Sequence, residues 1–473
     1  MAYDYDLIVI GSGPAGEKGA AQAAYFGKRV AVIEKEPKPG GAAVHTGTLP
    51  SKTLRETALF LSGHRQRELY GITVFVDRSM AVPKLLSRKD HVVSQEVARI
   101  DWNLDRHRVD RLNGIASFVD EHTIEILSKD NKRTITGEVV LIAAGSVPFQ
   151  PSNIPFLDPD IDDSDSILQI DRIPQTMLIM GAGVIGCEYA SMFAAMGVQV
   201  TLVEPRDELL SFLDADMSEA LRQSFLKTGM KVLLKESAAK VERDGDAIKT
   251  TLASGVEIRT EKFLFCAGRS GATARLNLEK VGVKVKSRGY VEVDADYRTA
   301  TPNIYAAGDV IGFPALASTS MEQARVAVCH AFGFTYKRQV GELLPYGIYT
   351  IPELSCVGLS EEDAKARGID TVCGRAEYRL NARGKIIGDD DGVVKLVFER
   401  GSRKLIGAHV LGDRATELVH IGQAIIVLGG TVETLIEMVF NYPTLAECYK
   451  YAAYDALGRW AGKTVPPGAV STS

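Results

Sequence analysis

Two stretches of this 473-residue chain repeat one pattern of glycines and an acidic residue, with Gly181 standing 170 positions after Gly11. Each copy has three glycines in the spacing G-x-G-x-x-G, then a fourth glycine and a glutamate: Gly11, Gly13, Gly16, Gly27 and Glu34 in the first, Gly181, Gly183, Gly186, Gly197 and Glu204 in the second. An apolar run comes before each copy, at residues 7–10 and 177–180. Such a run, followed at once by glycines, predicts a buried parallel strand that turns into a helix. Two copies therefore constrain the chain to an α/β fold with two similar units.

The spacing of these residues is the one that dinucleotide binding requires. The first glycine makes the tight turn, the second lets the backbone approach a pyrophosphate, and the third lets the helix pack on the strand. The free N–H groups and the positive dipole end of the helix then face the phosphates. Glu34 and Glu204, each 18 residues after the third glycine, are placed to accept a hydrogen bond from a ribose 2′-OH. Glycine-rich turns in an ordinary α/β domain would explain one copy, but two copies favour two bound nucleotides.

Composition argues against several classes of function. The hydrophobic content of 45%, the charged content of 24% and the net charge of −5 give no reason to expect nucleic acid or a membrane as a partner. The N-terminus lacks the basic segment of a secretory signal, so we expect a cytoplasmic protein. The six cysteines form no Cys-x-x-Cys pair and the eight histidines show no ligand spacing, so we expect reduced thiols and no metal site.

The patterns along the chain predict three domains. Residues 1–162 and 291–344 form a discontinuous domain around the first fingerprint, residues 163–290 form the domain of the second, and residues 345–473 form an α+β domain with antiparallel strands and two helices. The polar run at 162–166 is expected to be a hinge, and the tail after Ala461 is expected to be loose. The predicted fold class is therefore α/β, with two Rossmann-like domains and a C-terminal α+β domain.

Further motifs join the two fingerprints: Gly47-Thr-Leu-Pro-Ser-Lys52, Ala144-Gly-Ser-x-Pro148, Gly268-Arg269 and Tyr305-Ala-Ala-Gly-Asp309. With these motifs the chain resembles the pyridine nucleotide–disulfide oxidoreductase family from end to end. The resemblance implies FAD, bound without a covalent link, in the first domain and a nicotinamide nucleotide, NAD(H) or NADP(H), in the second. It also implies a homodimer or higher oligomer that assembles through the C-terminal domain.

The resemblance also assigns individual residues to the cofactors. Asp309 is expected to bind the ribitol chain of FAD, and the backbone of Ala116 is expected to lie near its adenosine part. Ala317, at the start of a helix, is expected to direct N–H groups at the flavin C2 carbonyl, because a helix N-terminus stabilises negative charge on the ring. The remaining cofactor-binding positions are Thr48, Gly145 and Gly268.

The chain departs from the disulfide reductases of this family at the residues that perform their chemistry. Those enzymes carry two cysteines before Pro-Ser-Lys, but here the two positions hold Ala43 and Thr48. They also carry a histidine base near the C-terminus that reaches the partner subunit's disulfide, and here that position holds Tyr442. A thiolate is the group that attacks a disulfide, and neither alanine nor threonine replaces it. We therefore expect no disulfide reduction by the family's route.

Hydride transfer is the chemistry that remains. The resemblance places Lys52 and Glu188 as an ion pair beside the flavin N5 atom, where an ammonium favours the anionic reduced ring; the alternative is two unrelated surface charges. Residues 45–48 and 441–444 look most like those of the soluble pyridine nucleotide transhydrogenases, which exchange hydride between NADPH and NAD⁺. We expect a ping-pong order through FAD without a catalytic disulfide. An NAD(P)H:quinone reductase of the same fold and a catalytically silent, FAD-loaded subunit are the alternatives.

Two side chains bear on which nucleotide the second domain binds. Glu204 suits the free 2′-OH of NAD(H) and should repel the 2′-phosphate of NADP(H). Arg206, two residues later, is expected to swing in and pair with that phosphate. A site for both nucleotides needs both side chains, whereas a plain NAD site beside a solvent-exposed arginine is the alternative.

Overall fold

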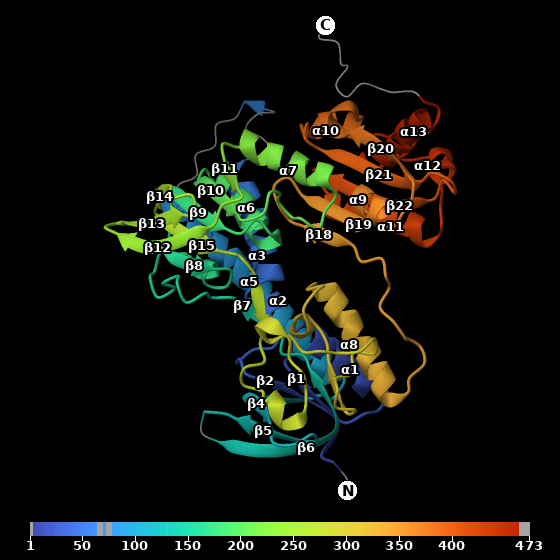
Figure 1. Ribbon diagram of the computed structural model, residues 1–473. Coiled ribbons are helices and arrows are strands. Elements are labelled where there is room, and N and C mark those ends of the chain that lie inside the picture. Colours follow the sequence, from blue (N-terminus) through green and yellow to red (C-terminus); the bar gives the residue numbers. More distant parts are fainter. Residues whose placement is uncertain (1–2, 64–69, 72–77, 130, 463–473) are drawn as a thin grey trace.

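The computed structural model describes residues 3–63, 70–71, 78–129 and 131–462, so the predicted loose tail lies outside the described residues from residue 463 onward. Figure 1 shows three parts. The first lies at the bottom of the view with the N-terminus, the second, in green, at the upper left, and the third, in orange and red, at the upper right. The architecture is α/β with parallel sheets, as the sequence predicts.

The first fingerprint lies in a sheet of seven strands. They are β1 (Tyr5–Ile10), β2 (Val30–Glu34), β3 (Asp110–Asn113), β4 (Ile115–Phe118), β5 (Thr123–Leu127), β6 (Lys132–Ile142) and β17 (Ile304–Ala306). Strands β3, β2, β1, β6 and β17 are parallel neighbours in that order, and β6 continues into an antiparallel ladder with β5 and β4. The chain thus returns to its first sheet with β17 after it has built the second.

The helices of this part are α1 (Pro14–Tyr25), α2 (Gly41–His45), α3 (Thr48–Ser62), α5 (Arg78–Arg106) and α8 (Ala317–Phe332). Helices α1, α5 and α8 pack on one face of the sheet, and the other face packs against β4, β5 and residues 276–283. Helix α1 packs against α8, and α3 packs against α5. Small residues at the α1–α8 contact permit this approach, because a side-chain carbon on Gly19 would lie 3.3 Å from the Cβ atom of Ala324.

The second fingerprint lies in a five-stranded parallel sheet with an antiparallel attachment. The parallel strands are β8 (Ile161–Asp163), β9 (Thr176–Met180), β10 (Gln199–Glu204), β11 (Lys231–Leu234) and β15 (Lys262–Phe265), in the order β11-β10-β9-β15-β8. The attachment consists of β12 (Ala238–Asp244), β13 (Ala247–Leu252) and β14 (Glu257–Thr260), and the helices are α6 (Val184–Ala195) and α7 (Ala215–Lys227). A short antiparallel pair, β7 (Ser146–Pro148) with β16 (Arg269–Gly271), links this part to the first.

The polar run at 162–166 is not a hinge, which corrects the sequence prediction. Its first residues belong to β8, which pairs with β15, and the predicted domain boundary at residue 162 falls inside this strand. Asp162 and Asp163 are buried. Their carboxylates are tolerated because Asp162 contacts the buried ammonium of Lys262 at 3.4 Å and Asp163 accepts a hydrogen bond from the N–H of Ser166 at 2.9 Å.

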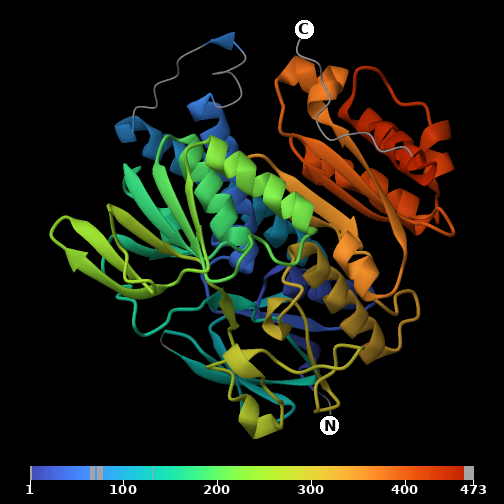
Figure 2. The same ribbon diagram turned by 45° about the horizontal axis from the view of Figure 1, so that its top comes forward.

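The third part is an antiparallel sheet covered by helices. Its strands are β18 (Tyr346–Ile348), β19 (Leu354–Gly358), β20 (Thr371–Glu377), β21 (Val393–Glu399) and β22 (Leu405–Leu411), in the order β18-β19-β22-β21-β20. Its helices are α9 (Glu361–Ala366), α10 (Ala382–Ile387), α11 (Ala415–Val427), α12 (Val432–Glu437) and α13 (Cys448–Trp460). Helix α7 of the second part reaches the third, where it contacts β22 (Figures 1 and 2). No helix in the described ranges is both long enough and apolar enough to cross a bilayer.

Candidate functional site

The two fingerprints fold into closely similar turns at the carboxyl ends of β1 and β9. Gly11 and Gly181 adopt φ angles of +101° and +104°, which a residue with a side chain rarely adopts. A side-chain carbon on Gly16 would overlap the carbonyl oxygen of Gly11, and one on Gly186 would overlap that of Gly181. Both copies therefore need glycine for the turn and for the close packing of helix on strand, as the sequence predicts.

The second glycine of each copy leaves room for a ligand. A side-chain carbon on Gly13 would have its nearest neighbour 3.9 Å away, and one on Gly183 would meet nothing within 4 Å. Helices α1 and α6 begin directly after these glycines, and no side chain of the described residues caps either helix. Free N–H groups beside open space are what a pyrophosphate binds.

The glutamate that ends each copy is held from the glycine turn. The Oε2 atom of Glu34 accepts hydrogen bonds from the N–H of Ser12 at 3.0 Å and from its hydroxyl at 2.6 Å. The Oε2 atom of Glu204 accepts a hydrogen bond from the N–H of Ala182 at 2.6 Å. Each carboxylate thus lies beside the glycine turn that receives the phosphates, where an adenosine ribose is expected.

The residue two positions after the glutamate distinguishes the copies. In both copies the N–H of this residue donates to Oε1 of the glutamate. Glu36 donates to Glu34 at 2.9 Å, and Arg206 donates to Glu204 at 3.1 Å. Arg206 also donates through Nε to Glu204 at 2.8 Å and through Nη1 to the hydroxyl of Ser211 at 2.6 Å. Burial raises the pKa of Glu204, but the hydrogen bonds from Arg206 and Ala182 outweigh it and hold that pKa below its ordinary value.

The movement of Arg206 toward a 2′-phosphate stays a prediction. In the structure Nε of its guanidinium pairs with Glu204. The Arg206 side chain is 51% exposed, so the outer edge of the guanidinium faces solvent at the ribose end of the site. Ser211, which accepts the hydrogen bond from Nη1 of Arg206, stands in no motif and was not predicted.

Lys52 and Glu188 form an ion pair between the first two parts of the molecule. The Nζ atom of Lys52, on α3, lies 2.6 Å from Oε2 of Glu188, on α6. The other oxygen of Glu188 accepts a hydrogen bond from the N–H of Tyr349 at 3.0 Å, and the ring centroid of Tyr349 lies 5.1 Å from the ammonium. Tyr349 stands in no motif, so sequence reasoning missed it. Their role beside a flavin stays a prediction.

The other predicted cofactor positions lie mainly around the first sheet. Gly145, with φ of +71°, follows β6, and Asp309 follows β17, so both lie at the carboxyl edge of these parallel strands. The hydroxyl of Ser146 donates to Oδ2 of Asp309 at 3.0 Å. Ala317 is the first residue of α8. The remaining positions are Thr48 at the start of α3, Ala116 in β4 and Gly268 after β15.

The cysteines do not replace the missing pair of thiols. All six are free, and five of them are buried. Cys187 and Cys266 flank predicted nucleotide-binding residues, and burial raises the pKa of both thiols far above the ordinary range. Because the thiolate is the reactive form of cysteine, these thiols are unreactive at neutral pH.

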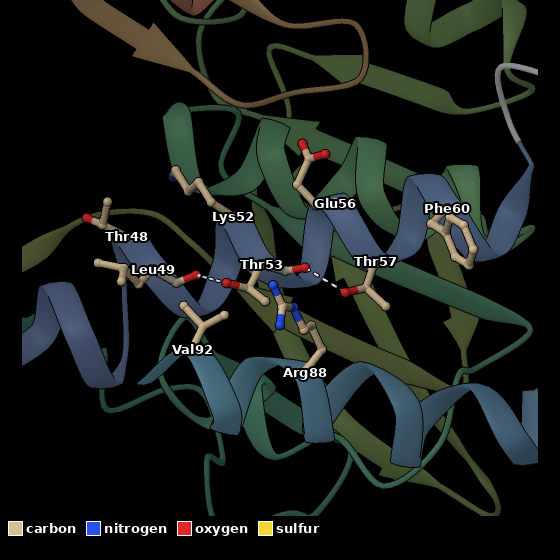
Figure 3. Close-up of a pocket in the computed structure, with 9 residues that line it drawn as sticks. All are labelled: Thr48, Leu49, Lys52, Thr53, Glu56, Thr57, Phe60, Arg88 and Val92. Carbon is tan, nitrogen blue, oxygen red and sulfur yellow. Dashed lines mark hydrogen bonds between the residues drawn. The ribbon is translucent and has the colours of Figure 1, made fainter. Parts of the chain in front are cut away.

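A cavity of about 550 Å³ opens beside Lys52. Figure 3 shows its lining residues on α3 and α5, with Thr48 and Leu49 toward one end and Phe60 toward the other. The hydroxyls of Thr53 and Thr57 donate to carbonyls one turn earlier at 2.8 Å and 2.9 Å, so toward a ligand they can act only as hydrogen-bond acceptors. The lining residues are Thr48, Leu49, Lys52, Thr53, Glu56, Thr57, Phe60, Arg88 and Val92.

Comparison with protein families identifies the fold that carries this geometry. The model of the pyridine nucleotide-disulphide oxidoreductase family matches residues 5–331, and the model of that family's dimerisation domain matches residues 344–453. The chain belongs to this family. It is therefore an FAD-dependent oxidoreductase that uses nicotinamide nucleotides. The dimerisation domain supports assembly into a homo-oligomer.

Individual relatives cover nearly the whole chain. The soluble pyridine nucleotide transhydrogenase of Mycobacterium tuberculosis is 46% identical over 458 residues, which is 96% of this chain and 98% of the relative. The protein of the same name from Pseudomonas paraeruginosa is 41% identical over 461 residues, or 97% and 99% of the two chains. The solved structure of the HOCl-induced flavoprotein disulfide reductase RclA from Escherichia coli is similar, with a TM-score of 0.86, 26% identity, and 95% and 99% of the chains covered.

The residues of the first fingerprint fit FAD. Gly13 leaves an open cradle before the uncapped N-terminus of α1, which suits a pyrophosphate. Glu34 lies at the end of β2 as an acceptor for a ribose hydroxyl, and the neighbouring Glu36 adds a second negative charge. The adenosine ribose of FAD carries a free 2′-OH, whereas a 2′-phosphate would be repelled by this pair of carboxylates.

Proposed function

We propose that this enzyme exchanges hydride between NADPH/NADP⁺ and NADH/NAD⁺, through FAD and without a catalytic disulfide. The observation that carries the proposal is the interlocked pair of Glu204 and Arg206, joined at 2.8 Å. In this proposal the carboxylate of Glu204 serves the 2′-OH of NAD(H), and the outer edge of the Arg206 guanidinium serves the 2′-phosphate of NADP(H) at the same ribose site. The names of the relatives, both soluble pyridine nucleotide transhydrogenases, support the same reaction.

The chain's own residues bind, orient and supply charge. Bound FAD supplies a ring that accepts a hydride from one nicotinamide and delivers it to another. Helix α6 connects two tasks, since its N-terminus faces the expected pyrophosphate and Glu188, in the same helix, holds Lys52. The ammonium of Lys52 stabilises negative charge that develops beside it, and Glu188 fixes its position.

A single nucleotide site explains the order of the reaction. The 2′-phosphate lies far from the nicotinamide ring, so NADPH and NADH present the same reacting end to the enzyme. Because the second fingerprint offers one Glu204–Arg206 pair, the first nucleotide leaves before the second binds. This is a ping-pong scheme. Neither Ala43 nor Thr48 has to supply a thiol, since a hydride needs no thiol relay.

One observation favours a second candidate, an NAD(P)H:quinone reductase. The cavity of about 550 Å³ beside Lys52 is large enough for a small aromatic ring system. Its wall between α3 and α5 includes Leu49, Phe60 and Val92 (Figure 3). A quinone there would take electrons in place of the second nucleotide.

An anaerobic titration distinguishes these functions. We expect NADPH to bleach the flavin absorbance of the purified enzyme and NAD⁺ to restore it. Steady-state exchange between NADPH and thio-NAD⁺ should then give parallel double-reciprocal lines, as ping-pong kinetics require. Recovery with benzoquinone but not with NAD⁺ would assign the enzyme to the quinone reductases. Absence of bleaching would mean a catalytically silent subunit.

A further inference from the structure

The Glu204–Arg206 pair does not balance the negative charge of the 2′-phosphate when NADP(H) binds. The two side chains neutralise each other, with Nε of Arg206 at 2.8 Å from the carboxylate. A phosphate monoester carries about −1.5 to −2 charges at pH 7. The outer edge of one guanidinium, already shared with Glu204, does not balance such a group. A site that holds a 2′-phosphate next to Glu204 therefore needs a second cation.

Lys235 stands at the same edge of the sheet as Arg206. Strands β10 and β11 run parallel with Glu204 opposite Leu234, so the next residue after β11, Lys235, lies beside the end of β10. The N–H of Lys235 donates to the carbonyl of Arg206 at 2.9 Å. This hydrogen bond fixes the backbone of the lysine against the residue that offers the guanidinium.

The backbone conformation of Lys235 is unusual, and its ammonium lies near the segment that follows β10. Its φ angle is +59°, in the left-handed region that residues other than glycine rarely adopt. Its side chain is 74% exposed, and Nζ lies 3.9 Å from Oδ2 of Asp207, which follows Arg206 directly. The ammonium is therefore next to the segment that carries Arg206 and is held only by a loose, solvent-exposed contact.

The first fingerprint offers an internal comparison. There β2 and β3 pair with Glu34 opposite Asn113, so the position that corresponds to Lys235 is Gly114. The position that corresponds to Arg206 is Glu36. Both cations are thus missing where FAD, with its free 2′-OH, is expected to bind. They occur together only in the copy that is proposed to meet a 2′-phosphate.

We infer that Lys235 and Arg206 together form a subsite for the 2′-phosphate of NADP(H). Arg206 presents the fixed edge of its guanidinium, and Lys235 brings a mobile point charge from the neighbouring strand. With NAD(H) bound, Lys235 stays in solvent beside Asp207 and Glu204 alone serves the 2′-OH. The inference rests on the proposed function, because it explains how one site accepts both nucleotides.

Calorimetric titration of the FAD-loaded enzyme with 2′,5′-ADP and with 5′-AMP tests the subsite without turnover. We expect the Lys235→Ala change to weaken binding of 2′,5′-ADP by roughly threefold to tenfold and to leave 5′-AMP unaffected. The difference should shrink in 0.5 M salt because the ammonium is exposed. Lys231→Ala is the matched control, since Lys231 is an exposed lysine at the start of the same strand.

The outcomes separate this inference from the function on which it rests. Unchanged binding of 2′,5′-ADP by Lys235→Ala, together with weaker binding by Arg206→Ala, would overturn the role of Lys235 and leave the dual site standing. Equal binding of both probes by the unmodified enzyme would overturn the subsite and the dual site together. If Lys235→Ala loses FAD or stability, Lys235→Gly replaces it, because glycine accepts a φ of +59° without strain.

Discussion

Lys52 and Glu188 hold opposite charges where two parts of the molecule meet. The Lys52 side chain is 25% exposed and that of Glu188 is 9% exposed, so the ammonium is reachable while the carboxylate is nearly enclosed. Removing the lysine would leave a carboxylate with only the N–H of Tyr349 at 3.0 Å. In the proposed function, Lys52 is the residue that would touch the reacting groups, and Glu188 would be a positioning residue.

We expect Lys52→Met to lower kcat for NADPH–thio-NAD⁺ exchange by about 10²-fold, the usual effect of removing one group that stabilises developing charge. The KM values should change little, because the lysine lies on α3 and not at the ribose end of α6. Steady-state exchange rates and the flavin content of the variant measure this. Lys385→Met, at an exposed lysine of α10, is the control. An unchanged kcat would remove Lys52 from the reaction.

Sequence reasoning paired Lys52 with Glu188 across 136 positions only because both stand in family motifs. Tyr349, which donates to Glu188, and Ser211, which accepts from Arg206, were not predicted. Each is brought in by tertiary folding from a segment without a distinctive pattern. A motif identifies the residue that carries a charge, whereas its supporting partners depend on which segments the fold places beside it.

The two strand–turn–helix elements have the same shape but different expected tasks. Gly16 and Gly186 each face the carbonyl oxygen of the first glycine in their own copy, and a side-chain carbon on either would overlap it. A methyl group there pushes the helix away from its strand and moves the N–H groups that face the phosphates. The same substitution in the two elements should therefore have different consequences.

We expect Gly16→Ala to yield protein with little or no FAD, and Gly186→Ala to retain FAD but raise KM for NADPH and NADH at least tenfold. The ratio of flavin absorbance to protein and steady-state kinetics measure the two effects. Gly458→Ala, in α13, is the control, because a side-chain carbon there meets no atom within 4 Å. Loss of FAD from both fingerprint variants would contradict the separate assignment of the two elements.

Elements with a regular pattern were predictable, and those whose stability depends on distant partners were not. Alternating residues predicted antiparallel strands in the third part, where β21 and β22 lie, and helical periodicity predicted helices there, among them α11. Strand β8 was predicted as a hinge because its residues are acidic and polar. Its sheet partner β15 and the buried Lys262 lie about a hundred positions away, so the sequence around β8 contains no pattern that predicts a strand.

The three parts are fastened by buried charges that cross from one to another. Lys395, on β21 of the third part, contacts Asp214 of the second part at 2.8 Å, and both side chains are almost fully buried. Arg55, on α3, donates to the carbonyl of Thr350 at 3.0 Å. The order of the parts was predictable from the sequence. These contacts were not, because single charged residues with no motif make them.

His409 gives the second–third junction a dependence on pH. It is buried next to the Lys395–Asp214 pair, and its Nε2 lies 3.1 Å from the carbonyl of Leu359. Burial lowers the pKa of His409 below its ordinary 6.5, against the opposing effect of Asp214 and Glu362, so the ring stays neutral in the folded protein. Below pH 6.5 the unfolded chain therefore binds a proton that the folded chain does not.

It follows that stability falls as pH drops below 6.5, by up to about 1.4 kcal/mol per pH unit for this one group, until the folded-state pKa is reached. Asp214 acts in a separate window. Burial raises its pKa, but His409, Lys395 and the N–H of Glu361 lower it below 3.8, so its contribution is lost only in stronger acid. We expect the urea midpoint of unfolding, at fixed protein concentration, to fall between pH 7.5 and 5.5. The His409→Gln change should reduce this dependence of the midpoint on pH. His420→Gln, at an exposed histidine, is the control and should leave the dependence unchanged. Equal slopes for the unmodified enzyme and His409→Gln would show that the junction is not the part of the molecule that senses acid.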